Sequence, residues 1–242
     1  MTRRMTIVIV WTIVAWTGGA LPVEATEIAT GRMLGPGYDP RAFYLREAPD
    51  RPWRKTYTGP EYRAEAQGRL MNLRIAQAFF HDEWMTEFTF DPAAHTQRVI
   101  DALDAYKAHG ILAINASLQG GNAGYNKEVP AITRLVAAKA GPGKGSLNSA
   151  FNADGSLKPA WMARVKALQQ ALDRRGMILN LTYFYAAQDE VLTDTTAIRE
   201  AVRTATDWLI DNDCRNVLIE IANGSITTDS ITTATSIARS DT

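Results

Sequence analysis

The sequence predicts an α/β fold, namely a partial TIM (β/α)8 barrel made of about its first four strand–helix units. Three observations lead to this prediction. Helices with apolar residues at helical spacing are each followed at once by a short apolar strand. Strands and helices that alternate in this way pair in parallel through right-handed crossovers. One face of each predicted strand is polar, which suits a barrel interior better than a flat sheet covered by helices on both faces.

The predicted elements follow one another from residue 69 to residue 223, which we expect to form one half-barrel domain. An opening strand is expected within residues 71–80, MNLRIAQAFF. The other elements are a helix over 99–106 with a strand over 111–117, a helix over 161–172 with a strand over 177–185, and a helix over 198–209 with a strand over 217–222. Each helix ends at a glycine or a polar turn.

Two flanking segments lack this pattern. Residues 26–68 are rich in Gly, Pro, Tyr and Arg without sustained periodicity, so we expect an irregular lead-in segment. Residues 224–242 form a low-complexity tail of Ser, Thr and Ile. A complete barrel takes ~250 residues and the regular pattern stops after four strands, so we expect this tail to be a frameshifted or truncated end. A natural Ser/Thr-rich tail on a short domain is the alternative.

The first 25 residues have the three parts of a secretory signal peptide. Two arginines at positions 3 and 4 precede an apolar run over 7–16, and a small-residue cleavage site ends at Ala25. A membrane anchor is the alternative, but glycines and a proline within 18–22 end the apolar run short of the ~20 residues that a spanning helix needs. We therefore expect cleavage after Ala25, a secreted or periplasmic protein, and no membrane partner afterwards.

Composition limits the cofactors and partners. The 26 basic residues balance the 26 acidic ones, which gives no reason to expect nucleic acid as a partner. The single cysteine, Cys214, excludes an intramolecular disulfide and is expected to be a small buried thiol. His81, His95 and His109 lack the spacing of a zinc motif. We expect no cofactor and no metal.

Strand alternation assigns side chains to two faces. Those expected to point toward the helices are Leu73, Ile75, Leu112, Ile114, Leu179, Leu181, Ile219 and Ile221. Those expected on the opposite, inner face are Arg74, Asn115, Ser117, Asn180, Thr182 and Glu220. Because an unpaired charge inside a barrel would cost several kcal/mol, Arg74 and Glu220 should each have a partner, either each other or another group.

The carboxyl ends of the predicted strands carry mainly amides and aromatics. In a barrel the reactive groups stand at these ends. Rings that stack on sugars and amides that bond to hydroxyls predict carbohydrate binding. The candidate substrate-binding residues are Gln77, Asp82, Trp84, Gln119, Asn122, Tyr125, Tyr183, Tyr185, Gln188 and Asp189. For each aromatic, packing under a loop is the alternative, and Asp189 could instead begin the next helix.

Two phrases, VKALQQALDRRGMILNLTYFY (165–185) and ATDWLIDNDCRNVLIEIAN (205–223), carry a resemblance to a known family. They resemble the third and fourth strands of cellulase-like, clan A glycoside hydrolases, most like family 5. The resemblance covers roughly residues 69–223 and implies a secreted enzyme that cleaves a polysaccharide with two carboxylates.

The site residues of that family match this chain only in part. In the family, strand four ends in Asn followed by the acid/base Glu. Asn223 matches the Asn, but residue 224 is Gly, and Glu220 matches an acidic residue often found three positions earlier. Tyr183 and Tyr185 stand where the family usually has a His.

Three functions follow as hypotheses. The first is a glycoside hydrolase-like protein acting on a polysaccharide or oligosaccharide, this chain being truncated and inactive. The second is a non-catalytic secreted carbohydrate-binding module. The third is a structural protein whose Tyr and Trp residues are only core. In each case the open edges of a half-barrel would favour self-association.

The first hypothesis predicts that Gly224→Glu does not create hydrolytic activity. The substitution restores the acid/base, but the second carboxylate, which the family carries on strand seven, is still missing. We expect no turnover of a β-glucan by either the chain or this variant. Measurable hydrolysis would point to a self-sufficient short enzyme.

Overall fold

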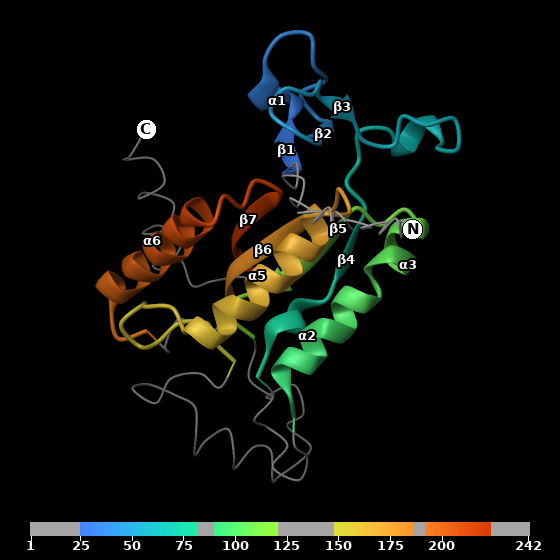
Figure 1. Cartoon of the computed structure of the whole chain (residues 1–242). Helices are drawn as coiled ribbons and strands as arrows, with labels where there is room; N and C mark the ends of the chain where they lie inside the picture. Colours follow the sequence, from blue (N-terminus) through green and yellow to red (C-terminus); the bar gives the residue numbers. More distant parts are fainter. Residues whose placement is uncertain (1–24, 82–89, 121–147, 186–191, 224–242) are drawn as a thin grey trace, which may run out of the picture.

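The computed structural model describes residues 25–81, 90–120, 148–185 and 192–223. The signal peptide expected up to Ala25 and the tail expected from residue 224 thus lie almost wholly outside the described residues. Figure 1 shows two parts: a four-stranded sheet with its helices, and a small N-terminal sheet at one end of it.

The larger sheet is parallel and confirms the predicted α/β class. Its strands are β4 (Asn72–Arg74), β5 (Ala113–Ser117), β6 (Ile178–Tyr185) and β7 (Val217–Asn223). They lie side by side in sequence order, β4-β5-β6-β7, and each neighbouring pair is parallel. Closure into a barrel stays a prediction.

The opening strand is shorter than expected. Within residues 71–80 only β4 is extended, and a 3₁₀ helix, η2 (Ala76–Phe79), follows it. This helix buries Ala78 and Phe79 completely. A run of small and aromatic apolar residues reads the same in a strand and in a buried turn of helix, so periodicity alone does not separate the two.

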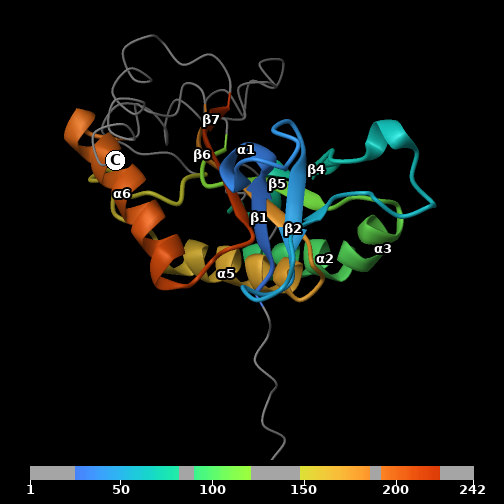
Figure 2. The same ribbon diagram turned by 90° about the horizontal axis from the view of Figure 1, so that it is seen from above.

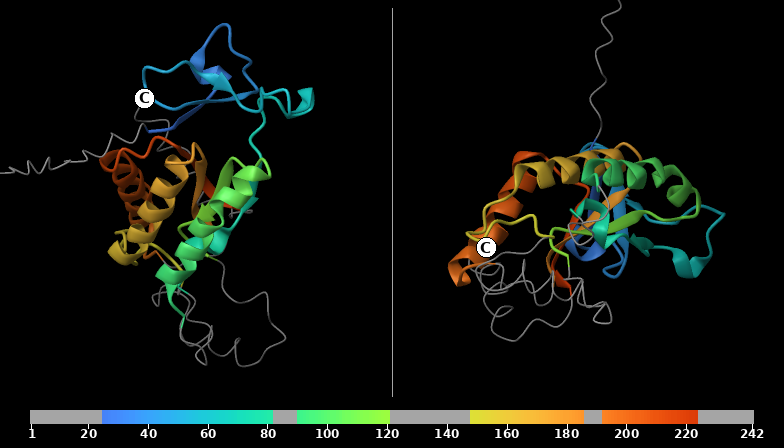
Figure 3. Two further views of the ribbon diagram at one scale, coloured as in Figure 1. Left: turned by 45° about the vertical axis from the view of Figure 1, so that its right-hand side comes forward. Right: turned by 90° about the horizontal axis from the view of Figure 1, so that it is seen from below.

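The helices that the structure describes in the parallel part lie on one face of the sheet. They are α2 (Pro92–Asp101), α3 (Leu103–Ala108), α5 (Pro159–Asp173) and α6 (Thr195–Asp211). Seen from above and from below, they form an arc along one side of the strands (Figures 2 and 3). None of the helices in the described ranges is long and apolar enough to span a membrane.

The helices begin where their sequences provide caps. The Asp91 side chain accepts hydrogen bonds from the backbone N–H groups of Ala93 and Ala94 at the start of α2. Asp194 does the same for Ala197 in α6. Such caps satisfy N–H groups that have no partner inside the helix. Proline, which lacks an N–H, occupies the first position of α2 and α5.

The apolar core lies between the helices and the sheet. Ile114, Leu179 and Leu181 point to this side and are completely buried, as the alternation predicts. Ile219 is the register partner of Leu181, yet it is 45% exposed. The difference arises because β7 is the last strand of the sheet, with no described strand beyond it. Self-association through this edge stays a prediction.

The lead-in segment is not irregular as expected. It contains a three-stranded antiparallel sheet of β1 (Glu27–Thr30), β2 (Phe43–Arg46) and β3 (Arg54–Lys55). A short helix α1 (Gly31–Leu34) and a 3₁₀ helix η1 (Ala64–Ala66) complete it. Strands of two to four residues are too short to show an alternating pattern.

Glu27 joins the small sheet to the parallel part. Its side chain is only 8% exposed and forms ion pairs with Arg46 of β2 and with Arg215, which precedes β7. The Arg215 contact is 2.9 Å and joins residues 188 positions apart. A second link is the Tyr57 hydroxyl, which donates to the Gly110 carbonyl at 2.7 Å. The small sheet therefore packs against the ends where the parallel strands begin.

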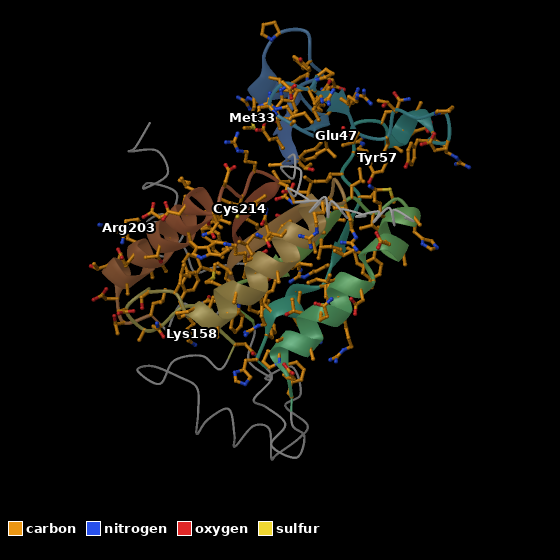
Figure 4. The ribbon with its side chains drawn as sticks, in the orientation of Figure 1. Met33, Glu47, Tyr57, Lys158, Arg203 and Cys214 are labelled. Carbon is orange, nitrogen blue, oxygen red and sulfur yellow. The ribbon has the colours of Figure 1, made fainter. Side chains whose placement is uncertain are left out.

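Glu27→Gln is expected to lower the free energy of unfolding by about 1–3 kcal/mol. The substitution keeps the shape of the side chain, but it removes the charge that two arginines contact in a buried position. Glu200→Gln is the matched control, because Glu200 pairs with Arg203 on the exposed surface of α6 (Figure 4). Chemical denaturation should show a loss for the first variant and none for the control. Equal effects would contradict the anchoring role of Glu27.

Candidate binding site

The polar face of the sheet lies opposite the helices and consists of Arg74, Asn115, Ser117, Asn180, Thr182 and Glu220. The strand register places these residues in two rows. Arg74, Asn115 and Asn180 are partners across β4, β5 and β6. Ser117, Thr182 and Glu220 are partners across β5, β6 and β7. Register partners in a parallel sheet share a face, so these residues lie on one face of the sheet, as the alternation predicts.

A hydrogen-bond network joins three strands on this face. The Thr182 hydroxyl donates to Glu220 Oε2 at 2.5 Å, and Asn115 Nδ2 donates to the same oxygen at 3.3 Å. Asn115 Nδ2 also lies 3.5 Å from Thr182 Oγ1. Both donors reach one carboxylate oxygen. No described residue bonds to the other oxygen, Oε1.

Two further polar atoms of this face have no hydrogen-bond partner among the described residues. They are Asn115 Oδ1 and Ser117 Oγ, and both are buried. Asn115 is 6% exposed and Ser117 is 0% exposed. Because buried polar atoms in native proteins are nearly always bonded, these two are open positions for a ligand or a water molecule. Asn115 Oδ1 and Glu220 Oε1 can only accept, so the group that meets them must donate.

The predicted partners of the two charged residues need correction. Arg74 and Glu220 do not pair, because two strands lie between β4 and β7. Glu220 is on the inner face as expected, and Thr182 and Asn115 stabilise it. Arg74 is exposed and has no ion-pair partner in the part of the chain that the structure describes. Water solvates an exposed guanidinium, so Arg74 does not need a counter-ion.

Gln119 is held inside the protein at the carboxyl end of β5. Its Nε2 donates to the Ser149 hydroxyl at 3.3 Å, and its Oε1 accepts from the backbone N–H of Tyr185 at 3.3 Å. The residue is completely buried. It therefore ties the segment around Ser149 to the end of β6. Gln77, by contrast, is exposed in η2.

Tyr183 was predicted to bind substrate, and this prediction is wrong. The residue is completely buried on the helix side of β6, where its hydroxyl lies 3.2 Å from Thr206 Oγ1 of α6. The apolar environment raises the pKa of the phenol to about 12. The burial of Tyr183 could have been predicted from the alternation within β6, because Leu179, Leu181 and Tyr183 share a face. Tyr185 follows the same alternation at the last position of this strand.

The sequence prediction concentrated on strand ends and so missed Asn115 and Thr182 as ligand-binding candidates. Both were assigned to the inner face, but they lie within the strands. Seven other positions of interest fall outside the described residues: Asp82, Trp84, Asn122, Tyr125, Gln188, Asp189 and Gly224. Asn223 ends β7 as the register partner of Tyr185.

The described ranges contain neither a cluster of metal ligands nor a reactive thiol. No set of three or more His, Cys, Asp or Glu residues lies together there as a metal site would require. Cys214 is half-buried beside α6 (Figure 4), and burial raises the pKa of its thiol to about 11. The thiol is thus protonated at neutral pH and is a poor nucleophile.

The placement of Tyr183 predicts how stability depends on alkaline pH. The folded state holds this phenol proton up to about pH 12, whereas the ordinary pKa is 10. The unfolded chain therefore releases the proton first, and the stabilisation is lost as pH rises from 10 toward 12. In Tyr183→Phe the free energy of unfolding should fall less steeply over this range, as measured by urea denaturation. Identical slopes would show that Tyr183 is solvent-accessible.

No family model, no curated protein and no solved structure matches this chain. The resemblance to glycoside hydrolases gains no support from these comparisons and rests on the two sequence phrases alone. Function must therefore be inferred from the polar face. Its three adjacent strands β5, β6 and β7 carry the carboxylate of Glu220, the amide of Asn115, and the hydroxyl groups of Ser117 and Thr182.

Proposed function

We propose that this chain is a secreted, glycoside hydrolase-like protein whose polar face binds a polysaccharide or oligosaccharide without cleaving it. The observation that carries the proposal is the Asn115–Thr182–Glu220 network, next to buried acceptor atoms that have no described partner. The parallel strands in sequence order, with helices on one face and polar residues on the other, support a partial TIM barrel as the fold.

The open atoms of the polar face favour a ligand with hydroxyl groups. Glu220 Oε1 and Asn115 Oδ1 accept hydrogen bonds, and the Ser117 hydroxyl can accept or donate. A sugar offers several hydroxyl groups, which both donate and accept, at spacings comparable to those of side chains on neighbouring strands. An anionic ligand at these atoms would instead meet the carboxylate of Glu220 and be repelled, because the cation of the polar face, Arg74, lies on β4 with two strands between it and Glu220. A neutral carbohydrate therefore fits this face better than a phosphate or a carboxylate.

Cleavage would need a second carboxylate on this face. Retaining glycosidases place two carboxyl groups about 5 Å apart, and inverting enzymes place them somewhat farther apart. In β4 to β7 the single acidic residue is Glu220. A single carboxylate cannot supply the catalytic pair, and binding without turnover is the function that these strands support.

Titration of the chain with a panel of β-glucan, xylan and mannan oligosaccharides tests this function. We expect binding to at least one class, and Glu220→Gln and Thr182→Val should each weaken it by about tenfold, the equivalent of one hydrogen bond to a charged group. Glu200→Gln on the outer surface of α6 should leave affinity unchanged. Far-UV circular dichroism and the unfolding midpoint of each variant verify the fold.

Three results would count against the proposal. If no oligosaccharide of the panel binds, carbohydrate is excluded as the ligand of this face. If Glu220→Gln and Thr182→Val both leave binding unchanged, the binding site lies outside the polar face. Hydrolysis of a bound sugar that Glu220→Gln abolishes would make the chain an enzyme with its second carboxylate outside the four strands.

A further inference from the structure

The backbone nitrogen of Thr26 is held by a carboxylate. It donates to Asp173 Oδ1 at 2.7 Å, and the Thr26 hydroxyl donates to the Asp173 carbonyl at 3.2 Å. These contacts connect the residue before β1 with the last residue of α5, 147 positions away. Thr26 is 3% exposed, so it is the first buried residue of the described chain.

Asp173 lacks a counter-ion. The carboxylate forms no ion pair with any described residue, and it accepts a hydrogen bond from the backbone N–H of Thr26. Burial raises the pKa of this carboxyl, while the hydrogen bonds from Thr26 act in the opposite direction. A partly buried carboxylate without a cation loses solvation that a single amide N–H replaces only in part.

The expected signal peptidase site lies directly before Thr26. The small-residue pattern of a signal peptidase site ends at Ala25, so the residue after the expected cut is Thr26. Cleavage there converts the amide N–H of Thr26 into an ammonium group. The nitrogen is the same atom that already lies 2.7 Å from Asp173 Oδ1.

We propose that the Ala25–Thr26 bond is the processing site of this protein, and that the new terminal ammonium of Thr26 forms an ion pair with Asp173. Hydrolysis of the bond adds water, which leaves a carboxylate on Ala25 and an ammonium on Thr26. A charge-assisted hydrogen bond between ammonium and carboxylate is about twice as strong as a neutral one. Removal of the leader thus stabilises the mature fold, whereas a precursor that keeps it has only the neutral hydrogen bond from the Thr26 amide to Asp173.

The proposal explains why both residues lie where they do. A cut one residue later would remove Thr26 together with both hydrogen bonds to Asp173. A cut farther upstream would leave extra residues between the ammonium and the carboxylate. Only a terminus at Thr26 places the positive charge beside this carboxylate, which forms no ion pair with any described residue.

Two forms of the protein test the proposal. One begins at Thr26, released from a fusion partner by a protease that leaves no extra residue, and the other keeps Ala25 and an acetylated amino terminus. We expect the Thr26 form to unfold at a midpoint roughly 3 to 6 °C higher near pH 6. The difference should shrink as pH rises above ~8, where a free amino terminus loses its charge.

Asp173→Asn provides the decisive comparison. In this variant the Thr26 form and the acetylated form should unfold at the same midpoint, because the carboxylate is gone. Asp104→Asn is the control, since Asp104 pairs with Arg175 on the surface and does not contact Thr26. It should leave the difference between the two forms intact. Equal midpoints of the two forms with Asp173 present, or a difference that survives Asp173→Asn, would overturn the ion pair.

Amino-terminal sequencing of the protein exported by a bacterial host tests the processing site itself. A terminus at Thr26 is expected. A different terminus, or retention of the whole leader, would overturn the site whatever the stability measurements show. These experiments do not use a carbohydrate, so their outcome is independent of the function proposed for the polar face.

Discussion

The constraint on which the structure depends is that the described helices of the parallel part all cover one face of its sheet. Every strand must then bury alternate side chains and leave the others to a different environment. In β6, Leu179 and Leu181 enter the core, while Asn180 and Thr182 alternate with them on the opposite face, which they share with the buried Ile178 and Phe184. A sheet covered by helices on both faces would have apolar residues at all of these positions. The polar face is a consequence of this arrangement, and it also has an energetic cost, because Asn115 Oδ1 and similar atoms lower stability unless something bonds to them.

The N-terminal segment has a different role, because it anchors the fold through charge rather than through apolar area. Glu27 contacts arginines from β2 and from the turn before β7, and Asp173 contacts Thr26 at the end of α5. Both contacts join residues far apart in sequence near the strand beginnings. The small sheet is too short to be stable by itself, so these contacts with the parallel part are what fix it. The polar face, whose network lies within β5, β6 and β7, remains clear of them.

The sequence by itself determined the class of the fold, the order of its strands and the two faces of each strand. Periodicity and capping are local properties, which is why the four strands and the helices over 161–172 and 198–209 could be predicted. Alternation alone also assigned Asn115, Thr182 and Glu220 to one face. The place of Tyr183 near the end of a predicted strand, in contrast, suggested substrate binding, but this residue packs against α6.

Only the tertiary structure decided which of these residues meet. The register between β5, β6 and β7 brings Asn115 and Thr182 to one carboxylate oxygen of Glu220, whereas two strands separate Arg74 from Glu220. Register depends on how strands slide past one another, and no single segment encodes it. The same holds for Glu27 with Arg215 and for Thr26 with Asp173, because contacts over such sequence separations form only after the chain has packed.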